Sequence, residues 1–217
     1  CALYLRQNGL SVSVLLPNKA KKWMESEGLK SKNDSIDAQG LAKMGSEKSL
    51  PLWQPAAEYY YQLRSMTRHY QGLQEQKTVI SNQLHAFENG MYKNEMVLNN
   101  VNQLIELLET QITAMLVAIE EHISSDKTVK EKVDGICGIK GLGILSVAVI
   151  LAETNGFALF ENTPQLVSYS GYDVMENQSG SHVGKTRISK KGNSRIRRAL
   201  NMPALNVVRY KQKVFVD

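Results

Sequence analysis

The chain has 217 residues, of which 42% are hydrophobic and 22% are charged, and its formal net charge at pH 7 is +5. The mean hydropathy is −0.30, and the apolar run at residues 141–152 is too short to cross a bilayer, so we expect a soluble globular chain with no membrane partner. Cys1 and Cys137 form neither a metal-ligand spacing nor a disulfide framework, which favours a reducing compartment.

The first 16 residues predict one helix and one strand. Residues 1–9 have the pattern of the end of an amphipathic helix, and the LSVSVLL run at 10–16 alternates like a strand. A lone strand cannot satisfy its own backbone hydrogen bonds. Either its partner strands lie upstream of residue 1, or no strand forms here. We favour the first alternative, which would make the chain the C-terminal part of a longer protein.

A pair of aspartates opens a later helix. Residues 19–27 predict a short helix that ends at Gly28, and Asp34 and Asp37 begin another that runs through Met44. Two carboxylates three residues apart share a helix face and can hold a divalent cation such as Mg²⁺. An Asp at the N-cap with an acid three residues later is also how many helices begin, and spacing alone favours this capping role for Asp34.

Two long helices follow a linker at residues 50–55. Apolar side chains recur at alternating steps of four and three over residues 59–87, with Lys77 at the one polar position, as in a coiled-coil seam. An Asn-Gly pair at 89–90 ends this helix, and a second apolar helix face covers residues 101–123. The short connection predicts an antiparallel hairpin, which would serve as a spacer, as a dimerisation arm or simply as a helical core.

A glycine-rich turn joins two further predicted helices, at residues 129–136 and 144–153. The turn, GIKGLG at 138–143, resembles the helix-hairpin-helix module, in which backbone N–H groups and a helix N-terminus receive a DNA phosphate. Lys140 adds a positive charge to this turn. A GxxG turn between helices is also common for packing reasons, so the motif leaves both interpretations open.

The stretch at residues 177–198 concentrates basic charge. It contains no Asp or Glu, and its seven cations are Lys185, Arg187, Lys190, Lys191, Arg195, Arg197 and Arg198. Closely spaced cations repel one another unless an anion neutralises them, and phosphate is the usual anion for mixed Lys and Arg. The stretch therefore indicates a nucleic-acid contact, with a solvated basic loop as the alternative.

Two serines and a helix start lie within this stretch. Ser179 and Ser181 flank a glycine, and a hydroxyl beside bound phosphate suits phosphoryl transfer through a covalent intermediate. Asn193 is the expected cap of a last helix, residues 194–210, which follows an earlier helix that starts near Thr163. The arginines in the first turns lie at the positive end of the helix dipole, where a bound polyanion would stabilise them.

Four segments occur in an order that resembles a known family. They are SKNDSIDAQGLA at 31–42, the long helical hairpin, GIKGLG at 138–143, and QSG…G…ISKKGNSRIRRAL at 178–200. Together they closely resemble the DEDD-type transposases of bacterial insertion sequences, a group that includes the Piv and MooV invertases. Members of this family are bridge-RNA-guided DNA recombinases.

The resemblance implies a mainly α fold in three parts. Residues 1–50 would be the C-terminal remnant of a RuvC-like α/β domain with the ribonuclease H fold. Residues 51–125 would form an antiparallel coiled-coil hairpin. Residues 126–217 would form a helical transposase domain that contains the helix-hairpin-helix-like motif, the DNA-binding surface and the serine nucleophile.

The resemblance also implies site residues. The family binds Mg²⁺ with an Asp, Glu, Asp, Asp set, whose last two members match Asp34 and Asp37. Its nucleophilic serine, which attacks DNA to form a phosphoserine intermediate, best matches Ser179, with Ser181 as the other register. The nucleic-acid contacts we expect are Lys140, Lys185, Arg187, Lys190, Lys191, Arg195 and Arg198.

The partners implied are DNA at the element ends and target, a guide RNA, and further copies of the chain in a dimer or tetramer. The expected location is the bacterial cytoplasm, at the nucleoid. Because the family's first Asp and its Glu would lie upstream of residue 1, we expect the chain by itself not to be a competent recombinase. A non-catalytic helix-hairpin-helix module and a helical structural protein with a solvated basic surface are the competing hypotheses.

Overall fold

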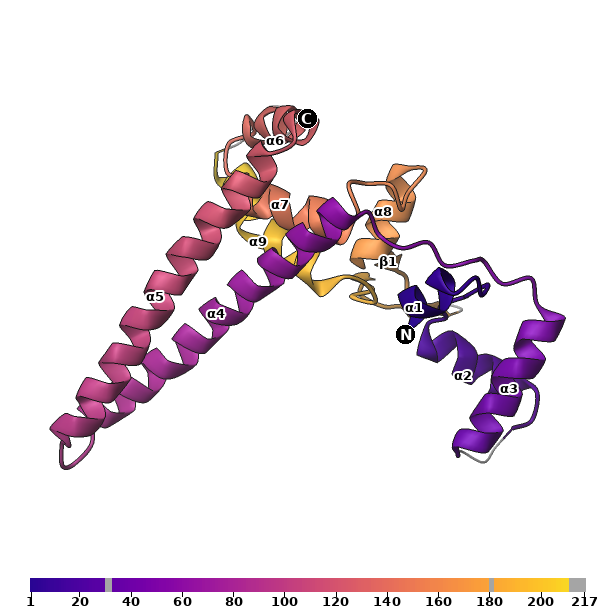
Figure 1. The fold of residues 1–217 in the computed structure, drawn as a ribbon, viewed down its shortest axis with the longest axis horizontal. Helices are drawn as coiled ribbons and strands as arrows, with labels where there is room; N and C mark the ends of the chain where they lie inside the picture. Colours follow the sequence, from indigo (N-terminus) through magenta and orange to yellow (C-terminus); the bar gives the residue numbers. More distant parts are fainter. Residues whose placement is uncertain (30–32, 180–181, 211–217) are drawn as a thin grey trace. The chain divides into compact units, whose positions relative to one another are not determined.

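The computed structural model describes residues 1–29, 33–179 and 182–210 and is mainly helical, as the sequence predicts (Figure 1). The chain divides into two compact units, Cys1–Pro55 and Ala56–Asp217. In the described ranges, no helix combines the length and the hydropathy that a bilayer crossing requires.

The first unit is a small set of helices. Its helices are α1 (Ala2–Gln7), α2 (Pro17–Ser26) and α3 (Asp34–Glu47). Ala20 of α2 and Met44 of α3 are buried, and the absence of a side chain at Gly40 lets the two helices approach, because an added Cβ would lie 2.7 Å from the sulfur of Met24. Pro17 is well placed as the first residue of α2, where no intrahelical N–H bond is lost.

The strand that we predicted at residues 10–16 is not formed, so that prediction is wrong. These residues lie outside regular secondary structure. The carbonyl of Val12 accepts one hydrogen bond, at 2.7 Å, from the backbone N–H of Trp53 in the linker. One such bond is not a ladder, and a strand is defined by a ladder with a neighbouring strand.

The second unit begins with a long helical hairpin (Figure 1). Its two helices are α4 (Glu58–Glu88) and α5 (Glu95–Ser124). The side chain of Asn94 caps α5 by accepting hydrogen bonds from the backbone N–H groups of Met96 and Val97. Lys77, the polar interruption of the apolar pattern in α4, reaches across the hairpin to Glu109, with 2.7 Å between the ammonium nitrogen and the carboxylate oxygen.

The core of the second unit lies where the base of the hairpin meets two shorter helices. These are α6 (Lys127–Cys137), which Asp126 caps, and α7 (Ile144–Glu153). The buried core side chains are Leu63, Ile119, Ile123, Val129, Val133, Val147, Ala148, Leu151 and Ala152. Burial of each larger aliphatic side chain contributes about 1.5–3 kcal/mol, so this cluster fixes α7 as the central element of the unit.

The C-terminal part packs its last helix on α7 and contains short strands that we did not predict. Its helices are α8 (Thr163–Ser170) and α9 (Ser194–Arg209). Its strands form two antiparallel pairs, β1 (Val174–Met175) with β4 (Arg187–Ile188) and β2 (Gln178–Ser179) with β3 (His182–Val183). The sequence indicated a loop here because strands this short display no detectable alternation.

Candidate active site and nucleic-acid interface

Asp34 and Asp37 lie in the first turn of α3, in the first unit. The helix is capped by Asn33, whose side-chain oxygen accepts a 2.8 Å hydrogen bond from the backbone N–H of Ile36. The prediction that Asp34 is the cap is therefore wrong, because the residue before it fills that position. In the part of the chain that the structure describes, neither aspartate side chain makes a hydrogen bond or an ion pair, so both carboxylates are available at the positive end of the helix.

These two carboxylates are the candidate ligands of a hard cation. Asp37 lines a groove of about 650 Å³ between α2 and α3. Two further acids of this unit are held by lysines, since Glu25 lies 3.7 Å from Lys21 and Glu27 lies 2.6 Å from Lys43. Within the described ranges, no group of three or more His, Cys, Asp or Glu side chains is arranged to hold a metal ion. A pair of oxygen donors nevertheless suits Mg²⁺, which retains several water ligands.

Ser179 lies at the end of β2, where its side chain is exposed. In the ladder with β3 it is paired with His182. The two strand pairs are consecutive along one folded-back segment, which is closed by backbone hydrogen bonds from Ser189 to Asp173 at 2.8 Å and from Gly184 to Asn177 at 2.7 Å. This segment displays the Ser179 hydroxyl on a folded hairpin. The alternative nucleophile, Ser181, lies outside the described residues.

A close backbone junction positions the lysines that precede α9. The backbone N–H of Asn193 donates to the carbonyl of Tyr169 at 2.7 Å, and that of Lys190 donates to Gly171 at 3.0 Å. An added Cβ at Gly192 would lie 2.4 Å from backbone atoms of Gly171 and Tyr169. Only glycine fits this contact, which joins the end of α8 to the start of α9 and places Lys190 and Lys191 immediately before the helix.

The N-terminus of α9 is capped by Asn193, as predicted. The side-chain oxygen of Asn193 accepts hydrogen bonds from the backbone N–H groups of Arg195 at 2.9 Å and Ile196 at 3.3 Å. Its amide nitrogen donates to a carboxylate oxygen of Glu153 at 2.7 Å. The cap of the basic helix is therefore itself fixed by an acid at the end of α7.

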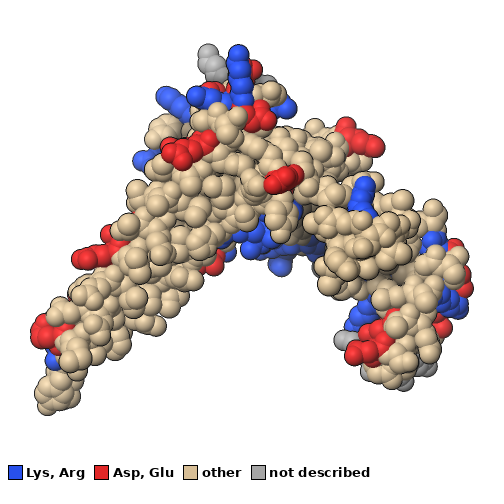
Figure 2. Space-filling view, viewed as in Figure 1, with Lys and Arg blue, Asp and Glu red and all other residues tan. Residues whose placement is uncertain are grey.

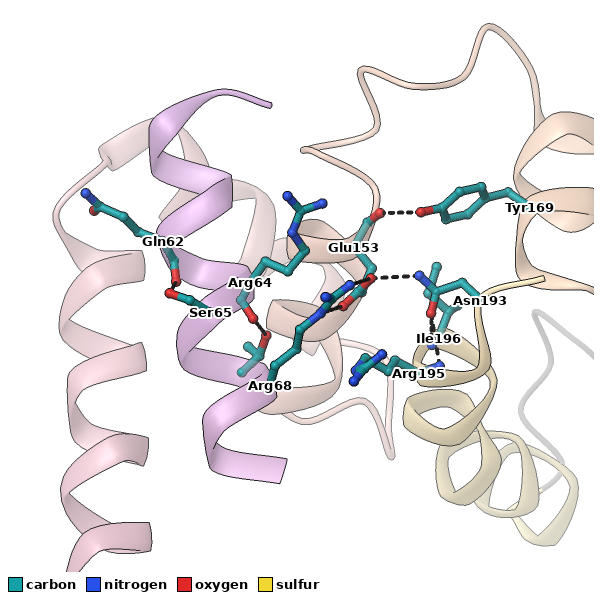
Figure 3. A network of polar contacts seen from close by, with 10 residues as sticks. Gln62, Arg64, Ser65, Arg68, Glu153, Tyr169, Asn193, Arg195 and Ile196 are labelled. Carbon is teal, nitrogen blue, oxygen red and sulfur yellow. Dashed lines mark hydrogen bonds and ion pairs between the residues drawn. The ribbon is translucent and has the colours of Figure 1, made fainter. Parts of the chain in front are cut away.

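Glu153 is the centre of a network that joins α4, α7, α8 and α9 (Figure 3). Its side chain is buried, and it accepts two hydrogen bonds from the guanidinium of Arg68, at 2.8 and 2.9 Å. The hydroxyl of Tyr169 donates to its backbone carbonyl at 3.1 Å. Burial raises the pKa of the Glu153 carboxyl, but the hydrogen bonds from Arg68 and Asn193 outweigh burial and hold the pKa below its usual value.

The sequence did not reveal this network, although one signal for it exists. Glu153 is the single charged residue of α7, which is otherwise almost wholly apolar. A lone acid at the end of a buried helix indicates a buried ion pair, since an unpaired carboxylate is too costly to bury. Its partner, Arg68, lies 85 residues earlier in the chain, and no local pattern could identify it.

The predicted nucleic-acid residues occupy different environments within the second unit. Four of them are exposed on or beside the strands and the α8–α9 junction: Lys185, Arg187, Lys190 and Lys191. Lys140 is exposed in the turn between α6 and α7. Arg195 is partly buried, and Arg198 forms an ion pair with Glu75 of α4. Arg197, which was not among the predicted contacts, donates to the carbonyl of Ser170 at 2.8 Å.

Lysine and arginine side chains gather in one region of the second unit, whereas both signs of charge are mixed at the top of the same view (Figure 2). Blue side chains gather beneath the base of the hairpin, where the yellow C-terminal segment lies in Figure 1. No acidic residue occurs at positions 177–198 to neutralise this segment. The exposed cations therefore form a surface that attracts polyanions.

Comparison with known proteins relates both parts of the chain to transposases. Residues 134–216 match the family described as transposase IS116/IS110/IS902, and residues 1–92 match the DEDD-type IS110 transposases. The pilin gene-inverting proteins of Moraxella bovis and Moraxella lacunata are each 24% identical to the chain over 197 residues, which is 90% of this chain and 59% of each relative.

The chain belongs to the IS110-type transposase family. The resemblance drawn from four sequence segments is confirmed. DEDD-type transposases generally use a divalent metal ion. The chain spans about 59% of the length of the curated relatives that it matches.

Proposed function

We propose that this chain contributes the serine nucleophile and the principal DNA-binding surface of a transposase that recombines DNA through a phosphoserine intermediate. The observation that carries the proposal is the segment at residues 177–198. It combines an exposed Ser179, seven cations and no acidic residue on a backbone held by strand pairs and by the α8–α9 junction. The name of the Moraxella relatives, which refers to inversion of a pilin gene, supports strand exchange as the outcome.

In the proposed reaction, the Ser179 oxygen attacks a backbone phosphorus atom. A Ser–O–P bond forms, one P–O bond of the DNA breaks, and the departing DNA oxygen leaves as a hydroxyl. The hydroxyl end of another strand then attacks the phosphoserine, which restores the DNA backbone and returns a proton to the serine. The reaction needs no net hydrolysis, and the neighbouring cations stabilise charge that develops on the phosphate.

Asp34 and Asp37 are the proposed metal ligands. A bound Mg²⁺ would polarise a phosphate oxygen and stabilise negative charge on it. The support is chemical, since both carboxylates start α3 and neither is used by a cap or an ion pair in the described residues. Two carboxylates alone should bind the ion weakly.

Family membership supports a proposal for the domain organisation and for the other partners. We assign residues 1–50 to a RuvC-like domain, 51–125 to a coiled-coil arm and 126–217 to the transposase domain. We also propose a guide RNA as a second nucleic acid, a dimer or tetramer as the assembly, and a location at the nucleoid. The apolar hairpin and the excess of basic surface support these assignments.

A second candidate function is non-catalytic DNA binding through the turn between α6 and α7. This turn contains Gly141 at φ +97°, a conformation that favours glycine, next to the exposed Lys140. Such a turn can present backbone N–H groups to a phosphate. This hypothesis needs no hydroxyl at Ser179, and that difference makes the two functions separable.

The test is to trap the covalent intermediate. The chain is incubated with nicked DNA duplexes and Mg²⁺, and DNA-linked protein is resolved on a denaturing gel. The assay scores covalent attachment alone, and not the complete strand exchange of which we expect this chain by itself to be incapable. We expect an adduct that is lost in Ser179→Ala and kept in Ser168→Ala, a control at an exposed serine of α8. If the unaltered chain binds DNA without forming an adduct, the non-catalytic function is favoured; if Ser179→Ala still forms an adduct, the assignment of the nucleophile is wrong.

A further inference from the structure

A small pocket lies where α4, α7 and α9 meet. It is separate from the pair of strands, β2 and β3, that carries Ser179. Its volume is about 200 Å³, and its lining combines apolar side chains such as Leu145 and Val149 with the polar side chains of Gln71, Ser146, Arg195 and Arg198. Pockets for whole cofactors or drug-sized ligands are usually about 300–1,000 Å³. This pocket therefore suits a chemical group and is too small for an entire nucleotide cofactor.

Arg195 is the unusual residue in this pocket. Its Nε is buried and, within the described residues, has no hydrogen-bond partner. A guanidinium carries five N–H donors and no acceptor, and buried donors of folded proteins are nearly always satisfied. The side chain of Arg195 lines the pocket, so a ligand seated there would meet a guanidinium whose donors are not all satisfied by the protein.

The local charge balance identifies the ligand as an anion. Arg68 is neutralised by Glu153, and Arg198 by Glu75. Arg195 helps to lower the pKa of Glu153 but forms no ion pair among the described residues. The positive charge of Arg195 is therefore not neutralised by an ion pair. It lies beside the apolar walls of the pocket, which limit water and strengthen charge pairing.

We propose that this pocket binds one phosphodiester group of DNA, with Arg195 as its principal ligand and Ser146 as a neutral hydrogen-bond donor. This inference rests on the proposed function for the source of the phosphate, which is a strand lying along the basic face of α9. Since Gln71 belongs to α4, the base of the helical hairpin becomes part of the DNA interface. The hairpin then has a direct role in binding and is more than a spacer.

The first test uses substitutions that keep the positive charge but remove the planar guanidinium. Only a contact that depends on the geometry of the guanidinium should weaken. Arg195→Lys keeps the charge but loses the planar fork that a phosphate engages, and we expect about a tenfold loss of affinity for a fluorescent DNA duplex. Arg209→Lys is the matched control, because Arg209 is exposed in the last turn of the same helix and lies outside the basic segment. It should leave affinity within about twofold, since an exposed cation acts mainly through its charge.

A second measurement needs no substitution in the protein under test. The Nε–H resonance of Arg195, assigned in the ¹⁵N spectrum by its absence from Arg195→Lys, is followed during titration with duplex DNA and, separately, with inorganic phosphate. We expect DNA to shift this resonance with the same midpoint as binding. If inorganic phosphate shifts this resonance and DNA does not, DNA is not the source of the phosphate group that the pocket binds.

The remaining outcomes distinguish the inference from the proposed function. If the unaltered chain binds DNA, but Arg195→Lys and Arg209→Lys behave alike and DNA leaves the Arg195 resonance unmoved, the pocket assignment is wrong while the DNA-binding function stands. If the unaltered chain does not bind DNA, the proposed function fails, and with it the assignment of a DNA phosphodiester to the pocket.

Discussion

The ion pair between Arg68 and Glu153 should respond very differently to removal of one partner or the other. The side chain of Arg68 is 44% exposed, whereas that of Glu153 is 2% exposed. If Glu153 loses its charge, Arg68 can still be hydrated. If Arg68 is removed, the carboxylate stays buried with no partner of opposite charge, and its hydrogen bond from Asn193 remains.

The expected magnitudes follow from this asymmetry. Loss of one partner of a buried pair costs about 3–5 kcal/mol when a buried charge is left uncompensated, and Arg68→Leu should lie near the lower end because Asn193 still donates. Glu153→Gln exchanges charge-assisted hydrogen bonds for neutral ones, and we expect a cost of about 1–2 kcal/mol. Arg64→Leu is the control on the same helix, and its cation–π contact with Tyr61 is worth less than about 1 kcal/mol.

The free energy of unfolding should depend on pH through the ionisation of Glu153, and the direction of that dependence differs between the unaltered chain and Arg68→Leu. In the unaltered chain the pKa of Glu153 lies below its usual value of 4.5, so its contribution to stability is present above that value and is lost as the pH falls through the folded-state pKa. In Arg68→Leu, burial is no longer outweighed and the pKa rises above the unfolded value. The destabilisation should therefore shrink as the pH falls from about 7.5 to about 5.

The assay is urea unfolding followed by circular dichroism at both pH values, which reports mainly on the long helices of the second unit. We expect Arg68→Leu to be the most damaging of the three variants at the higher pH and to regain part of its stability at the lower pH. A destabilisation by Glu153→Gln that equals or exceeds that of Arg68→Leu, with no dependence on pH, would refute the reasoning.

Two further pairs of substitutions test local features by thermal or urea unfolding. Asn33→Ala should destabilise α3 by about 1 kcal/mol through removal of its cap, whereas Asp34→Asn should change stability by less than about 0.5 kcal/mol; equal effects would contradict the assignment of the cap. Gly192→Ala should destabilise the second unit by more than about 2 kcal/mol, because its Cβ would meet backbone atoms at 2.4 Å. Gly72→Ala in α4, where the added Cβ meets nothing within 4 Å, should instead stabilise by about 0.5–1 kcal/mol, and a stabilising Gly192→Ala would exclude the close junction.

The helices were predictable from sequence because their signals are long and local. The apolar periodicity of α4 extends over several turns, and the caps at Asn193 and near Thr163 occupy the expected positions. Local signals failed where two readings compete over one or two residues. Asn33 and Asp34 are both good caps, and only the backbone geometry shows that Asn33 accepts the hydrogen bond.

The strands show a different limit. Residues 10–16 alternate like a strand but form one backbone hydrogen bond with the linker, whereas the strands near Ser179 are too short to alternate. Strand formation depends on a partner that the alternation does not identify. Pattern alone therefore placed a strand where none is formed and missed those that carry the candidate nucleophile.

The residue types of the candidate site were predictable from the sequence, but the contacts that hold those residues in place were not. The basic stretch and Ser179 are adjacent in sequence, so composition alone brought them together. The contact of Glu153 with Arg68 joins residues 85 positions apart, and the pocket at Arg195 needs three helices. Such features arise from packing, which a single sequence does not reveal.

We propose above all that the exposed cations of the basic segment at residues 177–198 bind DNA phosphates. The most direct test is the salt dependence of duplex binding, compared between the unaltered chain and the Lys190→Gln, Lys191→Gln double variant. We expect the slope of log affinity against log salt to become shallower by about one for each phosphate that the variant no longer neutralises. A matched change of charge on α6, Lys127→Gln with Lys130→Gln, should leave the slope almost unchanged. A slope that is the same in all three proteins would contradict the account, because the basic segment would then face solvent without touching DNA.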